Sequence, residues 1–202
     1  MKNKTLLGLS LALAALSGSA IAQTQGQSPW MVRARAVQLD FANGQNDLQA
    51  RVTAENRWIP EVDISYFFSK NLAAELVLTV PQSVDIQVAG QRQGTIKALP
   101  PSLLLQYHFT DLGLAKPYVG AGINHTMFFE RNNILAGAAQ VDRSSTGLAL
   151  QAGVDFAIDR NWSVNVDVKR INMDTRVRVN NADIGKLSLN PVTVGVGLGY
   201  RF

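Results

Sequence analysis

The closing segment of the chain, residues 190–202, alternates between apolar residues and small or polar ones up to the last position. A period of two indicates a β-strand that presents one apolar face. That face carries Val192, Val194, Val196, Leu198, Tyr200 and Phe202. Chain ends are usually loose. Here the final residue belongs to the apolar face, so we expect the end to be held by pairing with another strand.

Seven earlier segments alternate in the same way, and no segment after residue 22 shows a helical repeat. This pattern predicts an all-β, single-domain fold with eight strands. The predicted strands cover residues 30–41, 58–68, 72–80, 101–109, 117–129, 147–156, 162–171 and 190–202.

The connections between these strands alternate in length. Three are short (69–71, 110–116 and 157–161), and four are long and polar (42–57, 81–97, 130–146 and 172–190). Barrels of the outer membrane have tight periplasmic turns and longer external loops, and strands of about nine to eleven residues cross a bilayer at a tilt. The sequence therefore predicts an eight-stranded antiparallel up-and-down transmembrane β-barrel.

Aromatic residues gather at the ends of the predicted strands. A soluble β-sandwich, the alternative all-β fold, has no need to sort aromatic residues by strand end, whereas amphipathic rings prefer membrane–water interfaces. The belt beside the short turns comprises Trp30, Phe68, Phe109, Tyr118, Phe156, Trp162, Tyr200 and Phe202; the opposite belt comprises Phe41, Trp58, Phe128 and Phe129.

Membrane insertion would also explain the pattern at the C-terminus. In hydrocarbon every backbone N–H and C=O must be paired within the protein, so the sheet has to close. We expect the last strand to pair with the first and the chain to end at the membrane surface. Tyr200 and Phe202 also resemble the C-terminal signal by which the barrel-assembly machinery recognises outer-membrane barrels.

The N-terminal residues have the layout of a secretory signal peptide. Lys2 and Lys4 precede an apolar run at 6–16, and Ala20-Ile21-Ala22 offers a cleavage site. The run is too short for a transmembrane anchor. We expect residues 1–22 to be removed during export, leaving a barrel domain at 23–202.

The composition of this mature chain excludes several classes of protein. Its formal charge falls from +4 to +2 when the two lysines are removed, and no basic cluster remains that could grip nucleic-acid phosphates. The chain has no cysteine, so neither disulfides nor thiolate metal sites are available.

Several blocks resemble the outer membrane protein W family. They are Ser-Lys-Asn-Leu-Ala-Ala-Glu-Leu at 69–76, Leu-Pro-Pro-Ser-Leu-Leu-Leu-Gln-Tyr at 99–107, Pro-Tyr-Val-Gly-Ala-Gly-Ile-Asn at 117–124 and Gly-Tyr-Arg-Phe at 199–202. The resemblance extends over nearly all of the mature chain and implies an eight-stranded outer-membrane barrel with a narrow, partly apolar lumen. It also implies a role in helping small hydrophobic molecules across the outer membrane, with release sideways between strands.

Strand parity places a set of charged residues on the inward face. An Arg or Lys that faces lipid at mid-bilayer costs about 2–4 kcal/mol, so these side chains belong inside. The predicted lumen-lining polar residues are Arg33, Arg35, Glu61, Asp63, Glu75, Asp155, Asp167, Lys169 and Arg201. They could form a salt-bridged plug, because eight strands enclose little more than side chains, or a polar constriction along a conduction path. The near balance of the two signs favours the plug.

The inward face of the first strand changes character along its length. Val37, Leu39 and Phe41 follow Arg33 and Arg35 on the same face, so this face becomes apolar toward the outer end. The change predicts an apolar entrance to the lumen. Some relatives carry an aromatic residue where this chain has Lys169, and the lysine argues against an apolar gate at that position.

Enzymatic activity is not expected. The two histidines, His108 and His125, are predicted on opposite faces of the wall, and neither has a serine and an acid at suitable spacing. They also make no metal site, and no cofactor is predicted. The sequence favours a monomeric barrel in outer-membrane lipid that passes small hydrophobic solutes inward. The alternative is a closed structural or interaction barrel whose extracellular loops contact a host, phage or toxin.

Overall fold

The computed structural model describes residues 27–40, 57–88, 91–130, 139–179, 182–188 and 190–202. The predicted signal peptide, residues 1–22, and Phe41 of the predicted apolar entrance lie outside these ranges. Among the described residues, none forms a helix of the length and apolar character needed to cross a membrane.

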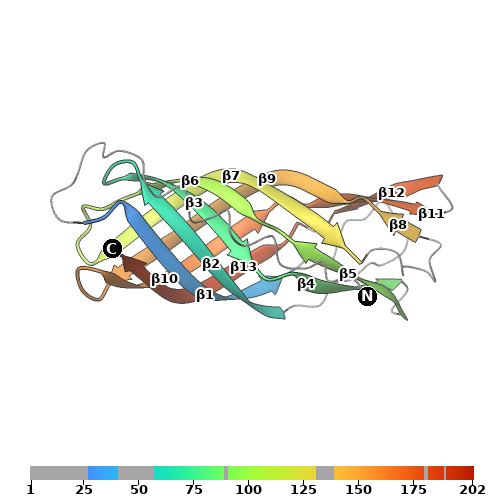
Figure 1. The fold of residues 1–202 in the computed structure, drawn as a ribbon, viewed down its shortest axis with the longest axis horizontal. Coiled ribbons are helices and arrows are strands. Elements are labelled where there is room, and N and C mark those ends of the chain that lie inside the picture. Colours follow the sequence, from blue (N-terminus) through green and yellow to red (C-terminus); the bar gives the residue numbers. More distant parts are fainter. Residues whose placement is uncertain (1–26, 41–56, 89–90, 131–138, 180–181, 189) are drawn as a thin grey trace, which may run out of the picture.

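Eight antiparallel strands close into a barrel, as the alternation predicts (Figure 1). Around the wall the order is β7-β6-β3-β2-β1-β13-β10-β9, and β9 pairs back onto β7. The strands are β1 (Trp30–Asp40), β2 (Arg57–Phe67), β3 (Leu72–Thr79), β6 (Ser102–His108), β7 (Ala115–Phe129), β9 (Ser144–Ala157), β10 (Trp162–Ile171) and β13 (Val192–Arg201).

The first and last barrel strands join along their whole length. Their register runs from Met31 opposite Arg201 to Asp40 opposite Val192. The last residue is held from both sides, because the Phe202 N–H donates to the Trp30 carbonyl at 3.2 Å and the Phe202 carbonyl accepts from Ser28 N–H at 2.6 Å. Pairing of the chain end is therefore what lets the sequence finish on an alternating strand.

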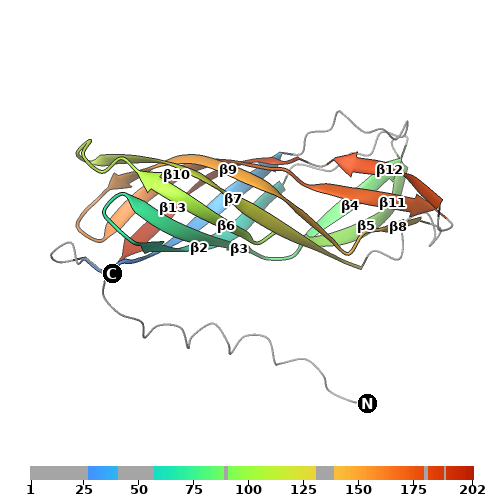
Figure 2. The same cartoon turned by 90° about the horizontal axis from the view of Figure 1, so that it is seen from above.

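The long connections contain strands that the sequence analysis assigned to loops. β4 (Gln82–Val88) pairs with β5 (Gln91–Leu99), and β11 (Asp174–Val179) pairs with β12 (Ala182–Ser188) and with β8 (Ala139–Val141). These hairpins extend the molecule beyond the barrel, at the end away from the C-terminus (Figure 1, Figure 2). Ladder hydrogen bonds can hold such hairpins without a continuous apolar face, so their alternation signal is weak.

Burial alternates along the barrel strands and separates an inner from an outer face. In β6, Ser102, Leu104, Gln106 and His108 are buried, whereas the intervening residues are exposed. The exposed residues across the wall are largely Leu and Val, as lipid contact requires. The apolar side chains thus face outward and the polar ones inward, the reverse of a soluble core.

Two members of the predicted aromatic belts are wrongly placed by the sequence analysis. Tyr118 and Phe128 are buried inside the barrel, because both lie on the inward parity of β7. The other described aromatic residues remain near the strand ends, and several form edge-to-face pairs such as Trp162 with Tyr200 and Tyr200 with Phe202. Phe41 lies outside the described residues.

Candidate functional site

The lumen holds a network of ionised side chains on the half nearest the short turns. We call this network the ionic plug. It comprises Arg33, Arg35, Glu61, Asp63, Glu75, Asp155, Asp167 and Lys169, all of them buried. The strands that supply it, β1, β2, β3, β9 and β10, carry these residues at every second position, so all eight point inward.

Arg33 is the most enclosed member of the plug, with no exposed surface. Its Nε and Nη2 donate to the two carboxylate oxygens of Asp155 at 3.1 and 2.8 Å. Its Nη1 reaches Glu75 at 3.2 Å, Asp63 at 3.4 Å and the Ser65 hydroxyl at 2.9 Å. One guanidinium therefore joins β1 to β2, β3 and, across the barrel, β9.

Arg35 lies one inward position further along β1 and makes a second hub. Its Nη2 pairs with Asp63 and, at 3.1 Å, with Glu61. Its Nη1 lies 3.4 Å from Asp167 and donates to the Asn165 amide oxygen at 3.1 Å. The two arginines share Asp63, so their charge networks are continuous.

Lys169 completes the plug at its upper edge. Its Nζ donates to both carboxylate oxygens of Glu61, at 3.1 and 3.2 Å. Within the plug, three cations face five carboxylates. The near balance of charge predicted from the sequence includes a fourth cation, Arg201, which lies outside the plug.

Arg201 lies at the end of the barrel that carries the short turns. Its guanidinium carbon lies 4.0 Å from the centre of the Phe67 ring, and its Nε donates to the Ser28 carbonyl at 3.1 Å. The His108 ring lies between the rings of Phe67 and Tyr118, with 4.9 Å between its centre and each of theirs. The Arg33 guanidinium lies over the Tyr118 ring. A series of side-chain contacts therefore runs from Arg201 to the plug.

Uncharged side chains outside the predicted set of polar lumen residues add hydrogen bonds to the plug. The Tyr118 hydroxyl donates to Asp167 at 3.0 Å, and the Asn165 amide donates to Asp155 at 2.9 Å. Gly153 makes room for Tyr118, because a β-carbon at that position would lie 2.5 Å from Tyr118 Cζ. The parity of Tyr118 and Asn165 on their strands indicates that both side chains face the lumen. It does not indicate their hydrogen-bond partners, which come from strands far apart in the sequence.

The inward face becomes apolar on the half toward the hairpins. On β1 and β10 the change occurs directly beyond the plug residues, as when Val37 and Leu39 follow Arg35 on β1. On β7 and β13 this half also carries buried polar residues, namely Asn124, Thr126 and Thr193. We call this set the apolar lining: Val37, Leu39, Ile59, Val77, Leu104, Phe128, Ala149 and Ile171, all buried. The structure thus places Val37 and Leu39 of the predicted apolar entrance inside the barrel.

The wall beside the apolar lining contains an interruption rich in proline. Pairing of β3 with β6 ends at Val77 opposite Ser102, and pairing of β4 with β5 begins at Gln82 opposite Ala98. Between these pairs, residues 78–81 face residues 99–101 without ladder pairing to one another. Three of these seven residues are Pro81, Pro100 and Pro101, which cannot donate to a ladder. We call this the proline gap.

Polar side chains satisfy the backbone carbonyls of the proline gap. The Asn124 amide, buried on β7, donates at 3.0 Å to the Pro100 and Pro101 carbonyls. The Gln82 amide donates to the Val80 carbonyl at 2.7 Å. Because a carbonyl in hydrocarbon needs a partner, these bonds allow the wall to stay unpaired at this point.

The histidines lie where parity predicts. His108 is buried, and its Nε2 lies 3.0 Å from the Gln106 amide oxygen. His125 is exposed on the outer face, and its Nδ1 lies 2.8 Å from the Thr146 hydroxyl. Among the residues that the structure describes, no group of three or more His, Asp or Glu side chains could hold a metal ion.

Known proteins resemble this chain along most of its length. The model of the OmpW family matches residues 26–202. An uncharacterised outer-membrane protein, y4mB, of Sinorhizobium fredii is 39% identical and covers 88% of this chain and 81% of its own. Outer membrane protein W of Escherichia coli is 30% identical over all of both chains.

The fold also matches a solved structure. The crystal structure of the outer membrane protein OprG from Pseudomonas aeruginosa superposes with a TM-score of 0.71, covering 87% of this chain and 97% of its own at 23% identity. At that identity the likeness concerns the fold. Together with the family match and the closed barrel with an apolar exterior, it places the protein in the outer membrane, and the chain belongs to the OmpW family.

Proposed function

We propose that the barrel guides small hydrophobic molecules from outside the cell along the apolar lining and releases them sideways into the membrane through the proline gap. The observation that carries this proposal is the position of the apolar lining directly above the ionic plug. A hydrophobic solute gains free energy when it leaves water for an apolar wall. The plug offers it no comparable environment below.

The ionic plug is a poor route for such a solute. To pass, the solute would have to separate buried ion pairs, and leaving one buried charge without its partner costs about 3–5 kcal/mol. Arg33 alone contacts three carboxylates. A path that avoids the plug is therefore favoured, and at the proline gap the two facing segments of the wall are not joined by ladder hydrogen bonds.

A relative supports the class of solute. A protein of Pseudomonas aeruginosa that is 23% identical over 87% of this chain is named for the dibenzothiophene metabolism operon. Dibenzothiophene is an apolar aromatic compound. We accordingly propose aromatic or aliphatic hydrocarbons of similar size as solutes for this chain.

The first experiment measures uptake of an apolar dye into liposomes that contain the purified protein. Leu39→Arg puts a charge on the apolar lining and should lower uptake several-fold. Gln140→Arg makes the same change in charge on the exposed strand β8, outside the barrel, and should leave uptake unchanged. Unchanged uptake in Leu39→Arg would refute the proposal and favour a closed barrel that acts through its outer hairpins.

The second experiment addresses the exit. Replacing Pro81, Pro100 and Pro101 by Val restores three backbone donors and should let the ladder extend across the gap. We expect slower uptake with an unchanged barrel yield. Pro117→Val is the matched control, because Pro117 lies on β7 opposite Val154, at the end of the barrel that carries the short turns. If the triple variant takes up dye at the wild-type rate, the exit lies elsewhere.

A further inference from the structure

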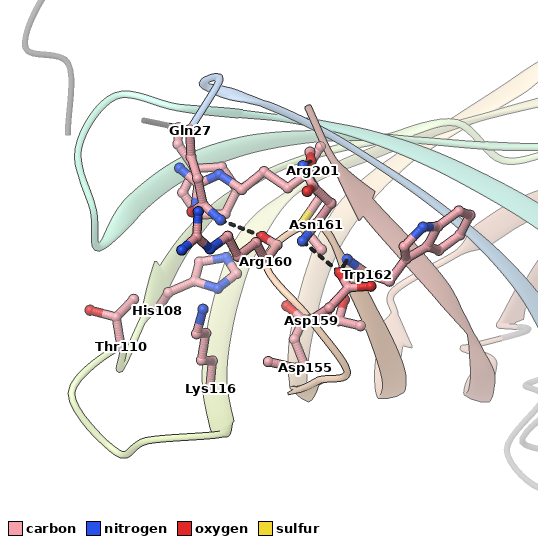
Figure 3. Close-up of a pocket in the computed structure, with 14 residues that line it drawn as sticks. Gln27, His108, Thr110, Lys116, Asp155, Asp159, Arg160, Asn161, Trp162 and Arg201 are labelled. Carbon is pink, nitrogen blue, oxygen red and sulfur yellow. Dashed lines mark hydrogen bonds between the residues drawn. The ribbon is translucent and has the colours of Figure 1, made fainter. Parts of the chain in front are cut away.

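The end of the barrel opposite the apolar lining contains a separate cavity. It measures about 40 Å³ and opens beside the short turns (Figure 3). This volume exceeds the minimum that a water-sized group requires. The walls include Lys116 at the start of β7, Arg160 in the turn between β9 and β10, and Arg201 at the end of β13. Three separate parts of the chain thus bring a cation to one small space.

These three cations lack ionic partners. Among the residues described by the structure, none of them lies within ion-pair distance of a carboxylate. Arg201 is held in place by Phe67 and by the bond from its Nε to Ser28, which leaves its two terminal nitrogens without a partner. In Figure 3 the side chains of Lys116 and Arg160 lie beside His108 on the same side of the cavity.

The acidic residues of the same wall are already engaged. Asp155 receives two hydrogen bonds from Arg33. Asp159 accepts the backbone N–H groups of Asn161 and Trp162 at 2.8 and 2.7 Å, and these bonds lower its pKa. Asp155 is shared with Arg33, and Asp159, which stays ionised, offsets one of the three cations. The lining of the cavity therefore keeps an excess of positive charge.

A buried hydroxyl provides an independent sign of a missing ligand. Ser163 lines the cavity, is only 7% exposed, and its Oγ has no hydrogen-bond partner. A buried hydroxyl without a partner is costly. A ligand with acceptor oxygens would satisfy this group and the cations together.

We propose that this cavity binds a phosphate group at the periplasmic face of the barrel. Phosphate oxygens match the donors of Arg and Lys, and the aromatic belt at Trp162 and Phe202 puts the cavity at the level of the inner-leaflet headgroups. The phosphate could belong to a phospholipid headgroup or to a soluble periplasmic compound. Both sources present the same chemistry to Lys116, Arg160 and Ser163.

The test uses the mature protein in micelles of a maltoside detergent, which is uncharged and carries no phosphate. Inorganic phosphate is titrated against chloride at equal ionic strength while NMR follows the Trp162 indole N–H. Binding of a free phosphate predicts a saturable shift in phosphate only. Binding of a headgroup predicts the same shift when phosphatidylglycerol is added to the micelles, with no inorganic phosphate present.

Variants separate a site from general electrostatics. Lys116→Gln and Arg160→Gln should each weaken binding by about ten-fold, since each removes a charge-assisted hydrogen bond. Ser163→Ala should weaken binding without destabilising the barrel. Lys70→Gln is the control, because Lys70 lies on another short turn and pairs with Asp111. The proposal fails if the indole responds in neither arm, if chloride gives the same shift, or if Lys70→Gln matches Lys116→Gln.

Discussion

The two halves of the lumen are built on the same strands and differ in chemistry. On β1, Arg33 and Arg35 are followed by Val37 and Leu39; on β10, Lys169 is followed by Ile171. All these side chains are buried and point inward. The comparison teaches that alternation decides only which face a residue occupies. The order of residue types along the inward face decides where the barrel is tied shut and where it offers an apolar surface.

The halves should also respond differently to mutation. A buried ion pair that loses one partner leaves a charge that neither water nor protein solvates. A buried apolar side chain that is shortened loses transfer free energy and leaves a cavity. The loss of stability is therefore expected to be largest in the ionic plug, smaller in the apolar lining and smallest outside both.

The largest effect is expected at Arg33. Arg33→Met leaves Asp155 without the guanidinium that contacts both its oxygens and removes one of the two arginines that contact Asp63 and Glu75, so the free energy of unfolding should fall by about 3–5 kcal/mol. Denaturant unfolding of the reconstituted protein measures this loss of unfolding free energy. The matched control, Lys70→Met, breaks an exposed pair with Asp111 and should cost less than about 1 kcal/mol. Similar losses in the two variants would mean that the plug contributes no more than a surface pair.

The upper edge of the plug offers a double-mutant test. Lys169→Leu alone should destabilise the barrel, because Glu61 loses the ammonium that contacts both its oxygens. Adding Glu61→Leu should restore stability to within about 1 kcal/mol of wild type, since apolar residues of similar volume often replace a buried pair without loss. The double variant also extends the apolar lining downward. A double variant less stable than Lys169→Leu would contradict this view.

Replacing side chains of the apolar lining by alanine should lower the free energy of unfolding moderately. Large-to-small substitutions in closely packed cores cost about 2–5 kcal/mol. If the lining borders a passage, Ile59→Ala and Ile171→Ala should each fall near the lower limit, about 2 kcal/mol, and should slow dye uptake. Losses near the upper limit with unchanged uptake would indicate a packed core instead of a passage.

The smallest effect is expected outside both halves, in the turn between β9 and β10. Because hydrogen bonds from Asn161 and Trp162 lower the pKa of Asp159 in the folded state, its ionised form stabilises the fold. This contribution is present above the unfolded pKa and is lost as pH falls through the lower, folded pKa. Asp159→Asn should therefore reduce stability slightly at neutral pH and have no effect in strong acid. A difference that persists in acid would have another cause.

Much of the barrel follows from the sequence because lipid imposes a simple rule. Every transmembrane strand must show one apolar face, so eight alternating segments, the inward charges and the joining of β1 to β13 could all be predicted. Outside the membrane this rule does not apply, and the sequence predicts loops where the structure has the hairpins β4–β5 and β11–β12. The position of Phe128 near a strand end predicts a place in the aromatic belt, whereas its parity on β7 correctly indicates the inward face.

The candidate site was harder to predict for physical reasons. The charged members of the plug follow from parity, but the bonds of Tyr118 and Asn165 depend on which strands face each other across the barrel. The sequence does contain a feature that indicates the proline gap, because Pro81, Pro100 and Pro101 are unfavourable in the interior of a strand. These prolines appeared to mark loop boundaries, and only the register of both hairpin strands shows that they face each other.

The most direct test of the contrast between the two halves uses a spin-labelled apolar solute and NMR of the protein in nanodiscs. The label broadens signals of the groups that it approaches. We predict broadening of the inward methyl groups of Leu39, Ile59 and Val77, with the Arg33 Nε–H signal remaining sharp. Equal broadening of Arg33 would show that solutes cross the ionic plug. Sharp signals from all four residues would show that solutes do not enter the barrel.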